Sequence, residues 1–211
     1  MPDDLRQDGA ASDDPALRGQ GLLGTHRLEA FSDGVMAVII TIMALDLRVP
    51  SSTTWHAVRE QVPRILAFAL SFSFIAIYWN NHHHLLRAAR RISAGVMWAN
   101  MLLLFWLALV PVLTAWIAHA PGDAMPAAFY GADALLASVA YGVLVRVIIR
   151  ADGPGSAVAA GIGNDLKGNV SVVAYAVAVP LAVVSPWIAY ALFVAVALVW
   201  MVPDRRLFGR A

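Results

Sequence analysis

Long apolar segments constrain this chain more than any other feature of its sequence. Of its 211 residues, 60% are hydrophobic and only 14% are charged, whereas about 25% are charged in a typical soluble domain. A membrane-spanning helix needs roughly 20 mainly apolar residues. Six stretches meet or approach this length: 26–47, 58–84, 94–118, 126–149, 167–184 and 186–202. The sequence therefore predicts an all-α integral membrane protein with six transmembrane helices per subunit.

The two ends of the chain differ from this apolar middle. Residues 1–25 are polar, acidic and small, and we expect a disordered cytoplasmic tail because they have too little apolar surface to bury. Residues 26–203 form the predicted six-helix transmembrane domain, and residues 204–211 a short basic cytoplasmic tail. Inside the fifth stretch, Pro180 is expected to kink the helix or end it early. Pro186 suits the first turn of the sixth.

Basic residues alternate between the predicted loops and so indicate an orientation. Lys and Arg cluster after the second stretch, around the fourth-to-fifth loop and after the sixth stretch, while the third-to-fourth loop has none. Because Lys and Arg favour cytoplasmic loops, both termini are predicted to be cytoplasmic. Arg48, Arg59 and Arg64 in the first outer loop argue mildly against this.

Composition also limits the function classes. The net charge is only +1, so no basic surface indicates a nucleic-acid partner. Cysteine is absent, which excludes disulfides and thiolate metal sites.

Polar side chains gather at one depth of the predicted membrane domain. Ionisable groups at that depth are costly and usually face protein or water. The alternating helices bring the following residues to one layer near the cytoplasmic face: Arg27, Ser32, Asp33, Asn80, Asn81, His82, His83, His84, Asn100, Asn169 and Ser171. We expect Asp33 to be held by Arg27 and by a histidine of the second stretch. A structural hydrogen-bond network is the favoured interpretation, with ion contact or gating as the alternative.

The three consecutive histidines do not by themselves predict a metal site. Adjacent helical residues point about 100° apart, so His82, His83 and His84 cannot converge on one ion. We expect no cofactor, and no metal beyond a permeating ion.

The first stretch carries an apolar stripe. Val38, Ile42 and Leu45 are spaced by four and three residues and so share one helix face, with Thr41 beside them and Asp46 at the outer end. Such a stripe usually packs against other helices. In a symmetric oligomer it would instead line a narrow hydrophobic pore.

Several segments resemble the transmembrane protein 175 family. Residues 27–35 read RLEAFSDGV, residues 41–50 read TIMALDLRVP and residues 78–83 read YWNNHH. These are similar to the first helix and the end of the second helix in that family. Asn100, with Pro111 and Thr114, is similar to its third helix. The resemblance covers about residues 26–116.

The resemblance implies a potassium-permeable channel. One six-helix unit per chain is similar to the bacterial branch, which assembles as homotetramers around a central pore lined by the first helix and lacks a T-V-G-Y-G filter. By motif, the pore lining would be Val38, Thr41, Ile42 and Leu45, with Asp46 at the outer mouth. The structural polar network would be Arg27, Phe31, Ser32, Asp33, His82, His83 and Asn100. Val38 replaces the family's usual Ile or Leu. The resemblance therefore does not indicate which of the apolar residues, repeated around the pore, would form its narrowest point.

Three function classes follow from these observations. The favoured hypothesis is a homotetrameric, cofactor-free cell-membrane channel that passes potassium and other monovalent cations passively. The alternative is a secondary transporter or proton-coupled carrier that uses Asp33 and His82 as a relay. A membrane enzyme is the third, but no nucleophile–base pattern accompanies the Asp/His layer.

Overall fold

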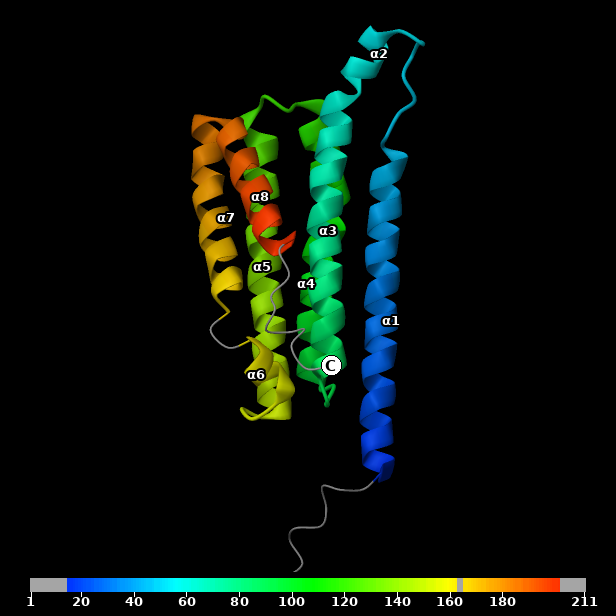
Figure 1. The fold of residues 1–211 in the computed structure, drawn as a ribbon, viewed down its shortest axis with the longest axis vertical. Helices are drawn as coiled ribbons and strands as arrows, with labels where there is room; N and C mark the ends of the chain where they lie inside the picture. The colour runs from blue at the N-terminus through cyan, green and yellow to red at the C-terminus, as the bar shows by residue number, and fades with distance from the viewer. Residues whose placement is uncertain (1–14, 163–164, 202–211) are drawn as a thin grey trace, which may run out of the picture.

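The computed structural model describes residues 15–162 and 165–201, and residues 15–23 and 162 by their backbone alone. All regular elements in this part of the chain are helices (Figure 1). They are α1 (Pro15–Leu45), α2 (Trp55–Glu60), α3 (Val62–Ala88), α4 (Ala94–His119), α5 (Ala124–Asp152), α6 (Ala157–Ile162), α7 (Leu166–Val184) and α8 (Pro186–Met201).

The prediction of an all-α membrane protein is confirmed. Five helical segments are long and apolar enough to cross a membrane: Gly24–Leu45, Trp55–Ala88, Ala94–His119, Ala124–Asp152 and Leu166–Val184. The sixth, α8, is apolar but has only 16 residues. At 1.5 Å per residue it is about 24 Å long, against a hydrocarbon core of about 30 Å. The described chain therefore has five or six spanning helices.

Helix boundaries differ from the sequence expectations at two places. α1 begins at Pro15, so residues 15–25, expected to be part of a disordered tail, are helical. Proline is favoured in a first turn, and Ala16 and Leu17 are good helix formers. Residues 1–14 and 202–211, which include the basic tail, lie outside the described residues. Pro180 does not end α7, which continues to Val184, whereas Pro186 is the first residue of α8, as predicted.

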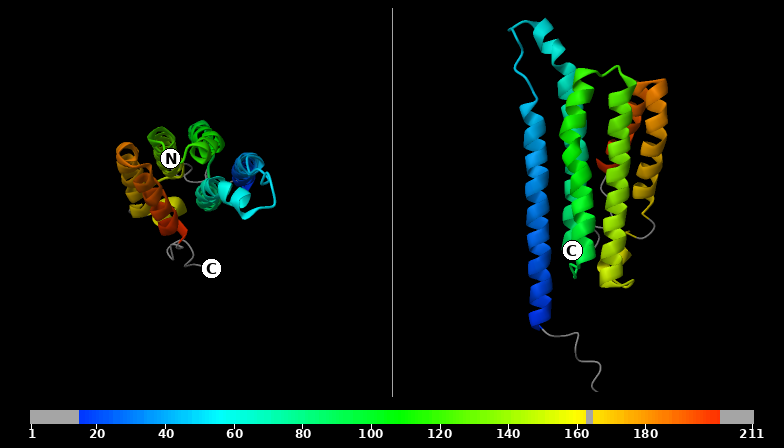
Figure 2. Two further views of the ribbon diagram at one scale, coloured as in Figure 1. Left: turned by 90° about the horizontal axis from the view of Figure 1, so that it is seen from above. Right: turned by 180° about the vertical axis from the view of Figure 1, so that it is seen from behind.

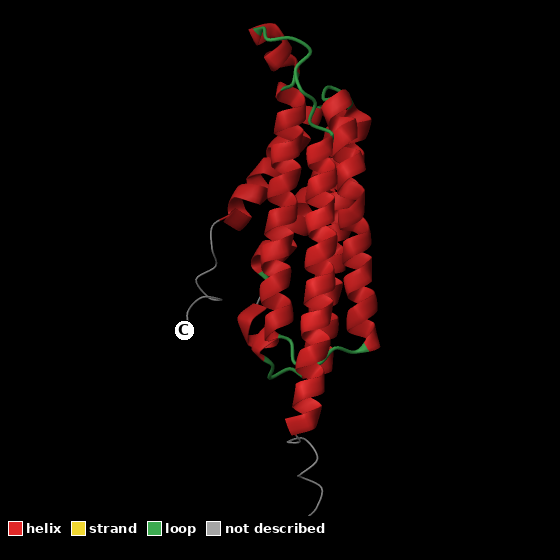
Figure 3. Cartoon of the chain, turned by 90° about the vertical axis from the view of Figure 1, so that its right-hand side faces the viewer, coloured by secondary structure: helices red, strands yellow, loops and turns green. Residues whose placement is uncertain are grey.

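The long helices form a bundle with α1 at its edge (Figures 1 and 2). α4 packs against α1, α3 and α5, and α7 packs against α5 and α8. The cartoon in Figure 3 shows α2 as a short helix beyond one end of the bundle. Because α1 packs mainly on α3 and α4, much of its surface has no neighbour among the described residues.

Close packing between α5 and its neighbours depends on Gly131. A Cβ atom there would lie 3.1 Å from Phe193 Cζ on α8 and 3.3 Å from Val179 Cγ2 on α7. Small residues let membrane helices approach closely where lipid provides no hydrophobic drive for association. Gly131 thus sets the distance between α5 and the α7–α8 pair.

The uncovered apolar face and inner polar cluster of α1

The apolar stripe predicted on α1 lies on the helix face that the bundle leaves uncovered. Val38 is 55% exposed, Ile42 50% and Leu45 84%. The opposite face packs into the core through Leu28, Met36, Ile39 and Met43. Both faces are apolar, so α1 has one apolar surface more than its own chain covers.

Thr41 and Asp46 lie next to this stripe. Thr41 is exposed, and its hydroxyl donates a hydrogen bond of 2.8 Å to the carbonyl oxygen of Val38. A hydroxyl that donates once still has oxygen lone pairs that accept or contact a cation. Asp46 follows the last residue of α1 and is half-buried.

A buried hydrogen-bond chain joins α1, α4 and α3. The side-chain amide of Asn100 donates to Ser32 Oγ at 2.9 Å. His82 Nε2 lies 2.7 Å from the Asn100 side-chain oxygen, and because that oxygen only accepts, His82 is the donor. All three side chains are fully buried. The structure thus brings together three residues of the predicted network.

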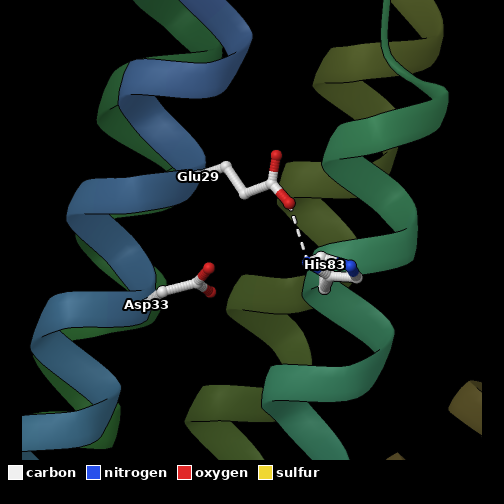
Figure 4. A group of neighbouring side chains, drawn as sticks. All are labelled: Glu29, Asp33 and His83. Carbon is white, nitrogen blue, oxygen red and sulfur yellow. Dashed lines mark ion pairs between the residues drawn. The ribbon is translucent and has the colours of Figure 1, made fainter.

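A second cluster lies between α1 and α3 (Figure 4). Glu29 Oε1 is 2.7 Å from His83 Nδ1 and 3.3 Å from Arg87 Nε. Glu29 is buried and Arg87 largely exposed, so the ion pair reaches from the protein interior to the surface. Asp33 lies beside the cluster, and its buried Oδ1 has no hydrogen-bond partner among the described residues.

The expected pairing of Asp33 with Arg27 is wrong for the described residues. Arg27 is exposed and forms no ion pair with any of them. The two residues are six positions apart, which places them about 120° apart around a helix. Phe31 is also exposed. These two members of the predicted network therefore do not join the buried contacts.

A direct bond for the predicted relay from Asp33 to His82 is not seen in the described chain: His82 Nε2 bonds to Asn100, and neither His82 Nδ1 nor Asp33 Oδ1 has a partner there. Within this cluster the carboxylate that contacts a histidine is Glu29, which is not a member of the predicted network. Glu29 lies four residues before Asp33, so helical spacing places both on one face. This four-residue spacing is the feature of the sequence that indicates a role for Glu29 beside Asp33.

A cavity of about 180 Å³ lies away from the stripe, between α3, α5, α7 and α8. Its wall is mostly apolar, with Arg146, Asp165 and Asn169 among its polar members. None of the predicted pore-lining or structural-network residues lines it, but Asn81, Asn169 and Ser171 of the predicted polar layer do.

Comparisons with known proteins agree with these features. Residues 27–111 match the family described as "Endosomal/lysosomal potassium channel TMEM175". Over 181 residues, the chain is 41% identical to a potassium channel of Chryseobacterium sp. (strain P1-3), covering 86% of this chain and 94% of that one. It is 31% identical over 116 residues to the human endosomal/lysosomal proton channel TMEM175, covering 48% of this chain and 23% of the human one.

A solved structure has the same fold. The crystal structure of a lysosomal potassium-selective channel TMEM175 homologue from Chamaesiphon minutus superposes with a TM-score of 0.73 at 26% identity, covering 84% of this chain and 96% of that one. Sequence and fold thus match along most of both chains, in a family of ion channels rather than enzymes. The chain belongs to the TMEM175 family.

Proposed function

We propose that this chain is one subunit of a passive, potassium-permeable cation channel of the cell membrane. In this proposal four copies assemble around an axis lined by α1, with both termini in the cytoplasm. The carrying observation is the uncovered apolar face of α1 at Val38, Ile42 and Leu45. Potassium is proposed as the permeating ion because the bacterial relatives are named potassium channels.

The spacing of the uncovered face suits helices that surround a common axis. Exposed apolar side chains recur every seven residues at Phe31, Val38 and Leu45, with Ile42 between the last two. A seven-residue apolar repeat keeps one seam of a helix directed at its partners. Copies of α1 would therefore present the stripe to each other along its whole length.

Rings of these side chains would form the main barrier to ions. An ion between apolar groups loses hydration without gaining replacement oxygens, and such constrictions gate by dewetting. Thr41 lies beside the stripe and offers a hydroxyl oxygen, whose proton is donated to the Val38 carbonyl. Four such hydroxyls would contact a partly dehydrated potassium ion, and Asp46 carboxylates at the outer mouth would attract cations.

Single-channel recording of α1 variants in lipid bilayers tests this proposal. Ile42→Asn and Leu45→Asn each add oxygen ligands to an apolar ring. We expect higher unitary conductance, about tenfold for each 1.4 kcal/mol taken from the barrier, together with weaker discrimination of potassium from sodium. Val38→Ala should change conductance less, because valine is already the smallest of the three side chains.

Val173→Asn is the matched control. Val173 is 62% exposed on α7, a helix that packs against α5 and α8, so the same kind of substitution there should leave the conductance equal to that of the unchanged protein. If all three stripe variants assemble normally and conduct as the unchanged protein does, α1 does not line the pore.

Proton permeation is the second candidate, because the animal relatives are named proton channels. Flux measured on purified protein in liposomes with separate potassium, sodium and proton gradients distinguishes the potassium channel from the proton channel. Potassium flux that continues without a proton gradient supports the potassium channel, and proton flux without potassium flux supports the proton channel. Saturable counterflow coupled to protons would instead support the carrier hypothesis.

A further inference from the structure

One side-chain cluster lies outside the buried hydrogen-bond chain of Ser32, Asn100 and His82. It consists of Glu29, Asp33 and His83. Each offers one ligand atom, and these three atoms all lie within 4.8 Å of one another. Figure 4 shows the two carboxylates on α1 directed toward the space in front of His83 on α3. We propose that they bind a divalent transition-metal ion of the Zn²⁺ type, which bridges α1 and α3 and is distinct from any permeating potassium.

The donor set favours such an ion. Zn²⁺ binds imidazole nitrogen at about 2.0–2.1 Å and carboxylate oxygen at about 2.0–2.2 Å. Three protein ligands leave a fourth position for water. Ca²⁺ and Mg²⁺ prefer oxygen donors alone, so the imidazole of His83 selects against them.

Backbone spacing supports convergence on one ion. Glu29 and Asp33 are four residues apart, so one face of α1 carries both. His83 approaches from α3 and already has its Nδ1 2.7 Å from Glu29 Oε1. An ion placed among three atoms that already lie within 4.8 Å of one another is close to all of them.

Two carboxylates, those of Glu29 and Asp33, meet one permanently charged group at this place, Arg87, 3.3 Å from Glu29. His26 and His83 also approach Glu29, at 3.8 and 2.7 Å, and add positive charge only when they are protonated. Asp33 Oδ1 is buried and accepts no hydrogen bond from the described residues. A buried carboxylate oxygen without a partner is costly, and a bound divalent ion would supply that partner.

The two ligands that are already in contact differ in burial. The side chain of His83 is 21% exposed, whereas that of Glu29 is 9% exposed, so the histidine is the more accessible of the two. The competing explanation is a direct ion pair between Glu29 and a protonated His83, which has the same geometry without a metal.

Isothermal calorimetry of ZnCl₂ with the purified full-length protein, in excess KCl, separates these explanations. The proposal expects one saturable site per chain. His83→Ala and Asp33→Asn should each weaken Zn²⁺ binding by at least about tenfold. A loss of affinity of this size is typical even when the changed residue only hydrogen-bonds to a metal ligand. Asp33→Asn keeps the shape of the side chain, so it provides the test if His83→Ala does not fold.

His56→Ala is the matched control. His56 and Glu60 form an exposed histidine–carboxylate pair, 3.3 Å apart, on α2. Its loss should leave the affinity unchanged. Absence of saturable Zn²⁺ binding, or binding that His56→Ala abolishes and His83→Ala and Asp33→Asn do not change, would overturn the proposal. Because binding is measured without ion flux, this outcome is independent of whether the chain conducts potassium.

Discussion

Asn100 illustrates how single polar residues hold this protein together. Its amide bridges Ser32 on α1 and His82 on α3, and all three side chains are buried. A side-chain amide supplies both donor and acceptor, so one residue satisfies two groups of opposite character. Away from water, Ser32 keeps only its own hydrogen bond to the Leu28 carbonyl, at 2.9 Å, and the described residues offer no other donor to Ser32 and no other acceptor to His82 Nε2.

Asn100→Leu should therefore destabilise the protein. The change leaves Ser32 without its donor and His82 without its acceptor, and each unsatisfied buried group costs about 1–3 kcal/mol. The loss is measured as a shift in the midpoint of denaturant unfolding in mixed micelles. Asn169→Leu, at an exposed position on α7, is the control. A midpoint no lower than that of the control would show that the bridge contributes nothing to stability.

At the scale of elements, the distance between helices depends on small residues. Gly131 allows α5 to approach Phe193 on α8 and Val179 on α7. Helix propensity opposes glycine by about 1 kcal/mol relative to alanine, so its presence within α5 is consistent with a packing requirement. α1 differs, because part of its surface has no partner within the chain.

Gly131→Leu should destabilise the α5–α7–α8 packing. Overpacking a well-packed interior costs about 1–3 kcal/mol, and here the added side chain meets the ring of Phe193. The measurement is thermal unfolding followed by near-ultraviolet circular dichroism. Gly131→Ala is the graded comparison, since its gain in helix propensity partly offsets the contact. Equal stability of the leucine variant and the unchanged protein would exclude this role for Gly131.

At the scale of the whole molecule, basic residues gather at one end of the bundle. The backbone N–H groups of Arg90 and Arg91, after α3, donate to Asp152 at the end of α5 at 2.8 and 2.9 Å. Arg150 lies in the last turn of α5. The loop between α4 and α5 lies at the opposite end and contains no Lys or Arg. This asymmetry favours the cytoplasm for the basic end.

Cysteine labelling tests this orientation against a clean background, because the chain contains no cysteine. Gly122→Cys, in the α4–α5 loop, should react with a membrane-impermeant maleimide added to intact cells. Gly155→Cys, between α5 and α6, should react only after the membrane is opened. Both positions are exposed, so burial does not explain a difference. The reverse pattern would invert the proposed topology.

Much of the architecture was accessible from the sequence for a physical reason. Lipid requires every spanning backbone group to be bonded within its own helix, so apolar length alone locates helices such as α4 and α5. Pro186 marked the start of α8 correctly. Of the two effects expected of Pro180, the early end does not occur, because a single proline inside a packed membrane helix does not end it when the surrounding structure continues the helix.

The pairing of polar side chains was only partly accessible. Depth in the membrane grouped Ser32, His82 and Asn100, and these do bond to one another. Depth does not specify the direction of a side chain around the helix, and Arg27 and Asp33 lie about 120° apart around α1. Helical spacing places Glu29 on the same face as Asp33, and Glu29 is the residue that contacts His83.

By itself, the sequence determined the helices, their apolar length and the level at which polar groups collect, because these follow from local composition and the lipid solvent. It did not determine which apolar face of α1 the bundle buries. Met36 and Val38 are both apolar, yet Met36 is buried and Val38 is 55% exposed. In lipid, hydrophobicity does not distinguish a packed face from a free one. Only the shape of the packed α3 and α4 surface decided that the stripe stays uncovered.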